Sequence, residues 1–368
     1  METYFLKKED IIKFYERIAQ EYELFVPVKA ESLSKPKCEC GPSLLTDNFT
    51  LKKFSQVNKE DIVFSDYRCI EPTRTFFTHY KEDLGTCFET TGLKEKKERP
   101  QALCGVKNCD IFALKIQDFV FLGGNEVDPT YKARRESTLI ISSDCPVFKD
   151  VCFCRAFDIN PYPVEGFDFN LTPLSNGYLI DVATQKSRMI ALSLKDIFAP
   201  ATLAQLSGRS AKRESANRRL DDYLKQYQIP KKETLQDIVL SGYNSPVWNE
   251  EMRTCVECNG CVFICDTCHC FLLTDDTSSG NARRLRLWDG CLFKNFTKVA
   301  GGGNALRLRY MRLRNRYLKK FDFFFSNLGI QACCGCGRCI DVCPGKIDIR
   351  RILRKLHESR YAPKEVTG

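Results

Sequence analysis

Two runs of four cysteines with the same spacing constrain this chain more than any other feature of its sequence. The first run is Cys255-Val-Glu-Cys258-Asn-Gly-Cys261-Val-Phe-Ile-Cys265, and the second is Cys333-Cys334-Gly-Cys336-Gly-Arg-Cys339-Ile-Asp-Val-Cys343. Both follow the pattern C-x2-C-x2-C-x3-C, a spacing at which thiolates ligate paired [4Fe–4S] clusters. The sequence therefore predicts a region that is organised around two such clusters.

The spacing also predicts which cysteines share a cluster. In the bacterial two-cluster ferredoxins, three thiolates of one run bind three irons of one cubane, and the fourth cysteine ligates the other cluster. Pro344 follows the second run as that pattern expects, whereas Asp266 follows the first run in place of proline. The predicted ligand sets are Cys255, Cys258, Cys261 and Cys343 for the first cluster, and Cys265, Cys333, Cys336 and Cys339 for the second.

Structural zinc is the simpler alternative, because C-x2-C pairs also bind zinc. Two complete four-cysteine runs fit cubanes better, since zinc would need only half of each run. The 368-residue chain has 21 cysteines and three histidines, and it is too long for a small disulfide scaffold. Its first residues have no apolar signal core, and no apolar stretch reaches membrane-spanning length. We expect a cytoplasmic protein without a membrane span.

The region before the cysteine runs is expected to form a mixed α/β domain over residues 1–200. Apolar residues at helical spacing predict a helix over 8–22, and a helical, basic connector follows at 201–250, with its helical composition strongest over 201–229. Short apolar runs bounded by turn residues predict strands at 61–64, 118–122, 138–142 and 178–183.

Residues 251–368 are expected to form an α-helical ferredoxin-like dicluster domain, which makes the fold class α+β. The two runs begin 78 positions apart (333 minus 255), too far for a compact ferredoxin hairpin. The spacer looks mostly helical, especially over 308–325. Its arginines either offset cluster charge or line a solvated helix face: Arg283, Arg284, Arg286, Arg307, Arg309, Arg312, Arg314 and Arg316.

A second group of cysteines lies in the N-terminal region. Cys109 opens a predicted helix, where the helix dipole favours a thiolate, and Cys145 follows a predicted strand. Spacing alone leaves a third cluster site and buried inert thiols both open. The group comprises Cys104, Cys109, Cys145, Cys152 and Cys154. Cys268, Cys270, Cys291 and Cys334 lie near the runs as supporting or packing residues, and we assign no role to Cys38, Cys40, Cys69 or Cys87.

At this point the chain resembles a known family, the iron–sulfur β subunits of cytoplasmic NiFe sulfhydrogenases, which are related to the A subunits of anaerobic sulfite reductases. The resemblance runs through most of the chain in one order. It rests on YRCIEPTRTFF, GVKNCDIFALKIQD, CFCRAFD, GFDFNLTPLSNGYLIDV, CVECNGCVFICDTCHC, RLWDGC, RNRYLKKFDFFFSNLGIQACCGCGRCIDVCP and IDIRRIL. The chain departs from the family pattern at Asp266 and Cys334.

The resemblance implies an N-terminal [4Fe–4S] cluster on Cys109, Cys145, Cys152 and Cys154, with Cys104 as the least favoured thiol, and hence three clusters in all. It also implies a flavoprotein partner that binds FAD and NAD(P), and terminal subunits of the hydrogenase or sulfite reductase type.

The chain itself has no motif for substrate chemistry, such as GxGxxG, a P-loop or a nucleophile elbow. Its net charge of +9 allows nucleic-acid binding, but no recognised nucleic-acid module is present. We therefore predict a non-catalytic electron-transfer subunit of an oxidoreductase complex. The alternatives are a subunit of another flavin-linked reductase, a stand-alone iron–sulfur binding or sensing protein, and an enzyme that uses an open iron of the N-terminal cluster as a Lewis acid.

Overall fold

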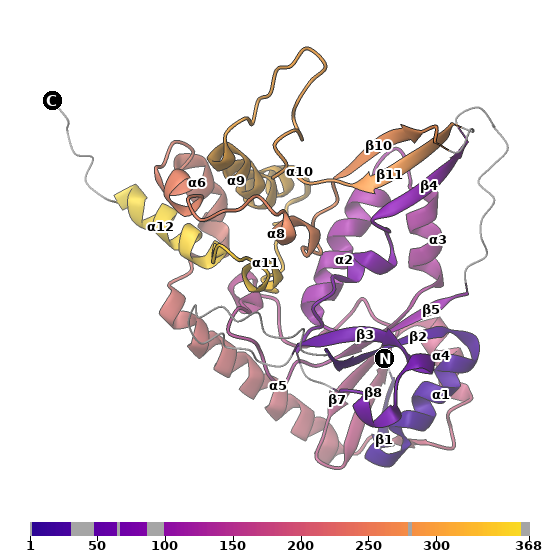
Figure 1. The fold of residues 1–368 in the computed structure, drawn as a ribbon. Coiled ribbons are helices and arrows are strands. Elements are labelled where there is room, and N and C mark those ends of the chain that lie inside the picture. The colour runs from indigo at the N-terminus through magenta and orange to yellow at the C-terminus, as the bar shows by residue number, and fades with distance from the viewer. Residues whose placement is uncertain (1, 31–47, 65–66, 87–98, 279–281, 362–368) are drawn as a thin grey trace.

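The computed structural model describes residues 2–30, 48–64, 67–86, 99–278 and 282–361. An eight-stranded mixed sheet organises its N-terminal part, with the strand order β3-β2-β5-β6-β7-β8-β1-β9 (Figure 1). The four strands from β2 to β7 run parallel, and the others pair antiparallel. The strands are β1 (Glu2–Lys7), β2 (Glu23–Lys29), β3 (Phe49–Lys53), β5 (Gln101–Val106), β6 (Leu139–Ser143), β7 (Phe169–Pro173), β8 (Gly177–Val182) and β9 (Phe198–Pro200).

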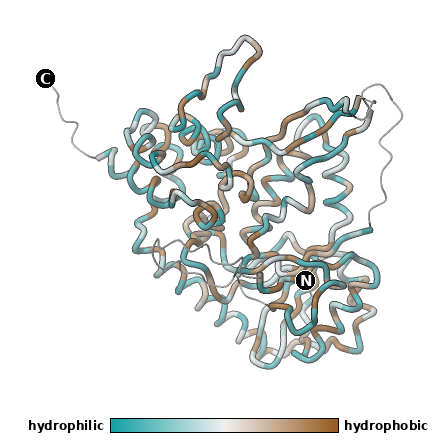
Figure 2. Tube along the Cα trace, in the orientation of Figure 1, coloured by the Kyte–Doolittle hydropathy of each residue, from teal (hydrophilic) through white to brown (hydrophobic). Residues whose placement is uncertain are grey.

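Successive side chains of a strand point to opposite faces of the sheet, and here both faces carry apolar side chains. Helices therefore cover both faces. On one face, α1 (Ile11–Glu21) packs through Phe14 and Ile18 onto residues such as Ala102 and Ile141. On the other face, α2 (Asn108–Phe121) and α3 (Pro129–Ser137) pack onto Leu103 and Ile140. The short α4 (Gln185–Leu192) joins the first of these layers. Figure 2 shows hydrophobic and hydrophilic residues interspersed along the chain.

The long helix α5 (Leu203–Leu224) leads from the sheet to a group of shorter helices (Figure 1). Their core surrounds the buried Trp248 and Tyr317, and it also takes in Phe153 and Phe157 from the N-terminal part. The helices are α6 (Leu235–Ser241), α7 (Val247–Glu251), α8 (Gly260–Phe263), α9 (Arg309–Leu318), α10 (Phe324–Leu328), α11 (Arg338–Asp341) and α12 (Ile349–Tyr361). A π-helical turn over Lys319–Phe323 joins α9 to α10.

The α+β class is confirmed, together with the helices expected at 8–22, 201–229 and 308–325 and the strands expected at 138–142 and 178–183. The strand predicted at 118–122 is wrong, because DFVF ends helix α2, and α2 is buried so widely that apolar residues fall on most of its faces. Residues 61–64 form no strand: Asp61 ends a 3-10 turn, and Ile62 makes one isolated bridge to Val28.

The spacer between the cysteine runs is less helical than expected. It contains a hairpin of β10 (Phe271–Asp276) and β11 (Arg283–Trp288), and β11 pairs with β4 (Lys81–Thr86) from the N-terminal part. The region around the cysteine runs therefore shares a sheet with residues far upstream. Along the described residues, no helix has both the length and the apolar character needed to cross a bilayer.

Candidate iron–sulfur centres

The four cysteines predicted for the first cluster line one cavity, and Cys339 of the second predicted set lines it with them. Cys255 and Cys258 come from the loop before α8, Cys261 lies on α8, and Cys343 follows α11. Two left-handed residues, Glu257 (φ 58°) and Asn259 (φ 58°), turn the loop sharply between its thiols.

Backbone amides already point at sulfur in this cavity. Glu257 N lies 3.4 Å from Cys255 Sγ, and Ile347 N lies 3.4 Å from Cys343 Sγ. Such N–H groups stabilise a thiolate and adjust the potential of a cluster that it holds. The donor set and the room between the thiols thus fit a cubane.

The four cysteines predicted for the second cluster come from the end of the first run and the start of the second. Cys333 and Cys336 are buried, and Cys265 and Cys339 are half-buried. Electrostatic coupling places these thiols near one another, since Cys265 influences the ionisation of Cys333, Cys336 and Cys339.

Positive charge gathers at this second site. Lys320 Nζ, on the π-helical turn, lies 3.4 Å from Cys265 Sγ. A hydrogen bond with Cys268, reinforced by the charges of Lys320 and Arg316, lowers the pKa of Cys265 well below its usual value. A hydrogen bond with Cys334 and the charge of Arg338 lower the pKa of Cys336 to about 6. Burial raises the pKa of the other two thiols, that of Cys333 to about 12 and that of Cys339 above its usual value. The site therefore favours the thiolate, the form that binds iron, at Cys265 and Cys336.

The N-terminal cysteines singled out by the resemblance line a separate cavity. Cys109 lies in the first turn of α2, Cys145 follows β6, and Cys152 and Cys154 flank the buried Phe153. Burial raises the pKa of Cys145 to about 12, so ionising this thiol requires compensating positive charge, which bound iron supplies. Cys104 does not line this cavity, because its side chain lies in the sheet core beside Tyr15.

The N-terminal cavity borders the second cysteine run directly. Gly335 and Cys336 form part of its wall, and Phe153 N donates a 2.8 Å hydrogen bond to Gly335 O. Gly335 has φ +63°, and a Cβ atom there would lie 2.6 Å from backbone atoms of Phe153 and Cys154. Gly337 has φ +73°, and a Cβ atom there would lie even closer to Val151 O. The two segments thus pack backbone to backbone, which only glycine permits.

Among the described residues, no three cysteine, histidine or acidic side chains converge on one point that a single ion would occupy.

Most of the spacer arginines pair with carboxylates or backbone groups away from the thiols. Arg283 pairs with Asp83, Arg284 with Asp275, Arg286 with Glu82 and Asp128, and both Arg309 and Arg312 with Glu257. Arg316 is different, because its Nη2 atom donates to Cys261 O at 3.2 Å and its side chain is buried. Burial opposes its charge, but the neighbouring Cys261 and Cys339 raise the pKa of Arg316 well above its usual value.

The remaining cysteines take varied positions. Cys268 contacts Cys265, Lys319 Nζ lies 3.8 Å from Cys270 Sγ, and Cys291 is buried. The backbone carbonyl of Cys69 accepts hydrogen bonds from Arg338. Cys38, Cys40 and Cys87 lie outside the described residues.

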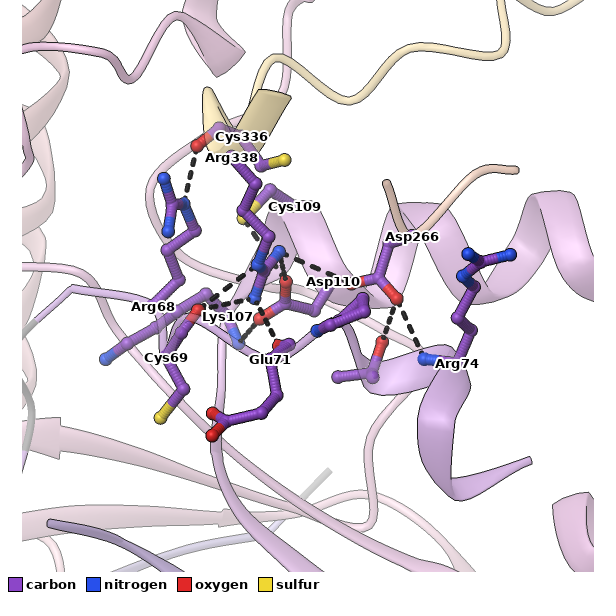
Figure 3. A network of polar contacts seen from close by, with 12 residues as sticks. Arg68, Cys69, Glu71, Arg74, Lys107, Cys109, Asp110, Asp266, Cys336 and Arg338 are labelled. Carbon is purple, nitrogen blue, oxygen red and sulfur yellow. Dashed lines mark hydrogen bonds and ion pairs between the residues drawn. The ribbon is translucent and has the colours of Figure 1, made fainter. Parts of the chain in front are cut away.

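The sequence interpretation missed the polar residues that tie the cysteine segments together, above all Arg68, Arg338 and Asp110. Arg68 Nε donates to Cys336 O at 2.5 Å, and Arg338 is enclosed by carboxylates and carbonyls (Figure 3). One signal was available. Asp266 replaces a proline of the ferredoxin pattern, and a carboxylate in such a place needs a buried partner.

Two comparisons with known proteins identify the dicluster region and the family of the chain. Residues 254–347 match the model of a 4Fe–4S dicluster domain. The β subunit of sulfhydrogenase 2 from Pyrococcus furiosus is 32% identical to the chain over 308 residues, which cover 83% of the chain and 89% of that relative.

Proposed function

The chain belongs to the family of sulfhydrogenase β subunits, and from that premise we propose that it relays electrons through three [4Fe–4S] clusters between a flavoprotein binding FAD and NAD(P) and a terminal subunit. It is an iron–sulfur electron-transfer subunit with a dicluster domain. The name of the relative, a sulfhydrogenase, favours a terminal hydrogenase over a sulfite reductase. The observation that supports the proposal is that predicted ligands line two cavities: Cys255, Cys258, Cys261, Cys339 and Cys343 line one, and Cys109, Cys145, Cys152, Cys154 and Cys336 line the other.

The proposed ligands are Cys255, Cys258, Cys261 and Cys343 for the first cluster, Cys265, Cys333, Cys336 and Cys339 for the second, and Cys109, Cys145, Cys152 and Cys154 for the third. When bound, such a cluster takes up and releases one electron at a time. The chain's own part is to hold the thiolates at fixed positions, to shield them from water, and to set the local charge through Lys320, Arg316 and the amides that face sulfur.

Iron analysis tests the number of sites. Anaerobically purified protein should contain about twelve iron and twelve sulfide ions per chain, at four per cubane. Cys109→Ser should lower both numbers by about four and leave the dicluster signals unchanged. Cys104→Ser is the matched control, because this thiol is equally internal but lies in the sheet core; its iron content should equal that of the wild type. About eight iron ions in the wild type would remove the N-terminal site from the proposal.

Partner capture tests the relay. The chain is tagged at one end and expressed from its native chromosomal gene under anaerobic conditions. It should copurify with a flavin-containing subunit and a nickel-containing subunit. Metal and flavin analysis of the purified complex reads out both. A monomer that carries its clusters and retains neither partner would instead support the stand-alone binding or sensing protein.

A further inference from the structure

A buried ionic group lies between the cysteine sites, and each of its members neighbours a proposed ligand in sequence. Arg338 precedes Cys339, Asp110 follows Cys109, and Asp266 follows Cys265. The side chains of all three are at most 3% exposed. Figure 3 shows the Arg338 side chain reaching toward Asp110, with Asp266 on the far side of that carboxylate.

The Arg338 guanidinium uses its donors on three separate segments. Its Nη1 atom lies 2.6 Å from Asp110 Oδ1 and 3.3 Å from Asp266 Oδ2. Its Nη2 atom donates to Cys69 O at 2.9 Å and to Glu71 O at 3.1 Å, and its Nε atom donates to Cys69 O and Ile70 O at 3.2 Å. A planar guanidinium can hold this many acceptors in one geometry, whereas an ammonium group cannot.

Each carboxylate is held from its other side as well. Asp110 Oδ2 accepts from Lys107 N at 3.0 Å, which caps the start of α2 where Cys109 lies. Asp266 Oδ1 accepts from Arg74 N at 2.8 Å and from Thr73 Oγ1 at 3.0 Å. The start of α2, the end of the first cysteine run and the middle of the second run are therefore joined through one side chain.

Buried ion pairs of this kind contribute little net stability, because desolvation offsets the attraction between the charges. Their better supported role is to select one arrangement among several. Here that arrangement is the position of Cys109 relative to Cys265 and Cys339. The segment of the second run already packs closely on the N-terminal part of the chain at Gly335 and Gly337.

We propose that Arg338 is a positioning residue that fixes the N-terminal cluster site and the second C-terminal cluster site at one separation and orientation. The inference rests on the proposed function, because it requires a cluster at each site. Electron transfer between two centres slows steeply as they move apart, so a relay needs this separation held constant. Arg338 binds no iron; it acts through the segments that carry the thiols.

The test is Arg338→Lys in the full-length, cluster-loaded chain, read by iron content and by EPR of the fully reduced protein. Lysine keeps the positive charge but reaches only part of the acceptor set. We expect this variant to contain as much iron as the wild type. The magnetic interaction between the reduced N-terminal cluster and the reduced second C-terminal cluster should weaken at least twofold. A residue that only stabilised the fold would lower the yield and leave this interaction unchanged in the folded protein.

Two further variants complete the test. Arg286→Lys is the matched control, because Arg286 is 7% exposed and bridges Glu82 and Asp128; its EPR spectrum should equal that of the wild type. If Arg338→Lys does not fold, Asp266→Asn removes one ion pair and keeps the shape of the side chain, and it should weaken the interaction in the same direction.

The outcomes separate cleanly. An unchanged magnetic interaction between the clusters in Arg338→Lys overturns the proposal; where that variant does not fold, the same result in Asp266→Asn does so. The proposal is also overturned if Arg286→Lys weakens the interaction equally, or if neither Arg338→Lys nor Asp266→Asn folds. A wild-type chain with about eight iron ions overturns the three-cluster function and the positioning role with it, and that result is read before any variant is made.

Discussion

Gly335→Ala should reduce the iron content of the chain from about twelve ions to about four, because it disturbs two cluster sites at once. At φ +63° an alanine pays about 1–2 kcal/mol for the left-handed conformation. Its Cβ atom would also lie 2.6 Å from backbone atoms of Phe153 and Cys154, which cannot rotate away as a side chain can. The segment carrying Cys333 and Cys336 must therefore separate from the segment carrying Cys152 and Cys154. Iron analysis and the thermal midpoint of the holoprotein measure the effect.

Gly329→Ala is the control that separates backbone strain from crowding. Gly329 has φ +69°, but nothing lies within 4 Å of a Cβ atom built there. This variant should lose about 1 kcal/mol of stability and keep all of its iron. Equal iron loss in the two variants would show that the conformation of the glycine, and not the close contact with the N-terminal segment, governs cluster retention.

Arg316→Gln should lower the reduction potentials of both C-terminal clusters. Arg316 is buried next to Cys261 of the first site and Cys339 of the second. Each cluster gains negative charge on reduction, which a nearby cation stabilises, so removal of the cation favours the oxidised form. We expect a fall of about 60 mV or more, which is a tenfold change in the ratio of oxidised to reduced cluster.

A redox titration followed by EPR measures this shift. Arg314→Gln is the control on the same helix, because Arg314 stacks on Tyr243 at 3.6 Å and donates to the Tyr243 backbone carbonyl, away from the thiols. Its potentials should match those of the wild type. Unchanged potentials in Arg316→Gln would contradict the assigned electrostatic role, provided that its iron content is that of the wild type.

The elements that the sequence predicted correctly are those whose apolar residues follow a simple pattern, either one face of a helix or a continuous run between turn residues. Helix α1 shows apolar residues on one face, and strand β8 is a buried apolar run between turn signals. Residues 118–122 misled the prediction because α2 is apolar around most of its surface, so its local composition resembles a strand. The hairpin at 271–288 carries charged residues and exposed apolar ones together, and its partner β4 lies far away in the sequence.

The same contrast holds for the sites. Ligand spacing is a local property, so the two C-terminal sets could be proposed directly from the cysteine runs. The N-terminal set needed a resemblance, because Cys109 lies on α2 and the other three cysteines lie in the chain after β6, at no ligand spacing that is typical of a cluster. The network of Arg338 with Asp110 and Asp266 joins residues up to 228 positions apart, and no local pattern encodes such a pairing. Asp266 was noted only as a missing proline, although its carboxylate meets three donors.

The wall that Gly335 and Cys336 contribute to the N-terminal cavity has a consequence for the order of biosynthesis. Gly335 is translated 181 residues after Cys154 (335 minus 154). At about 5–20 residues per second, the N-terminal thiols wait roughly 10–40 s for the segment that encloses them. During that interval the cavity lacks the wall formed by Gly335 and Cys336, and its four thiols are less enclosed: Cys109, Cys145, Cys152 and Cys154. A chain truncated before residue 335 should therefore lack this part of the cavity wall and leave these thiols more open to oxidation.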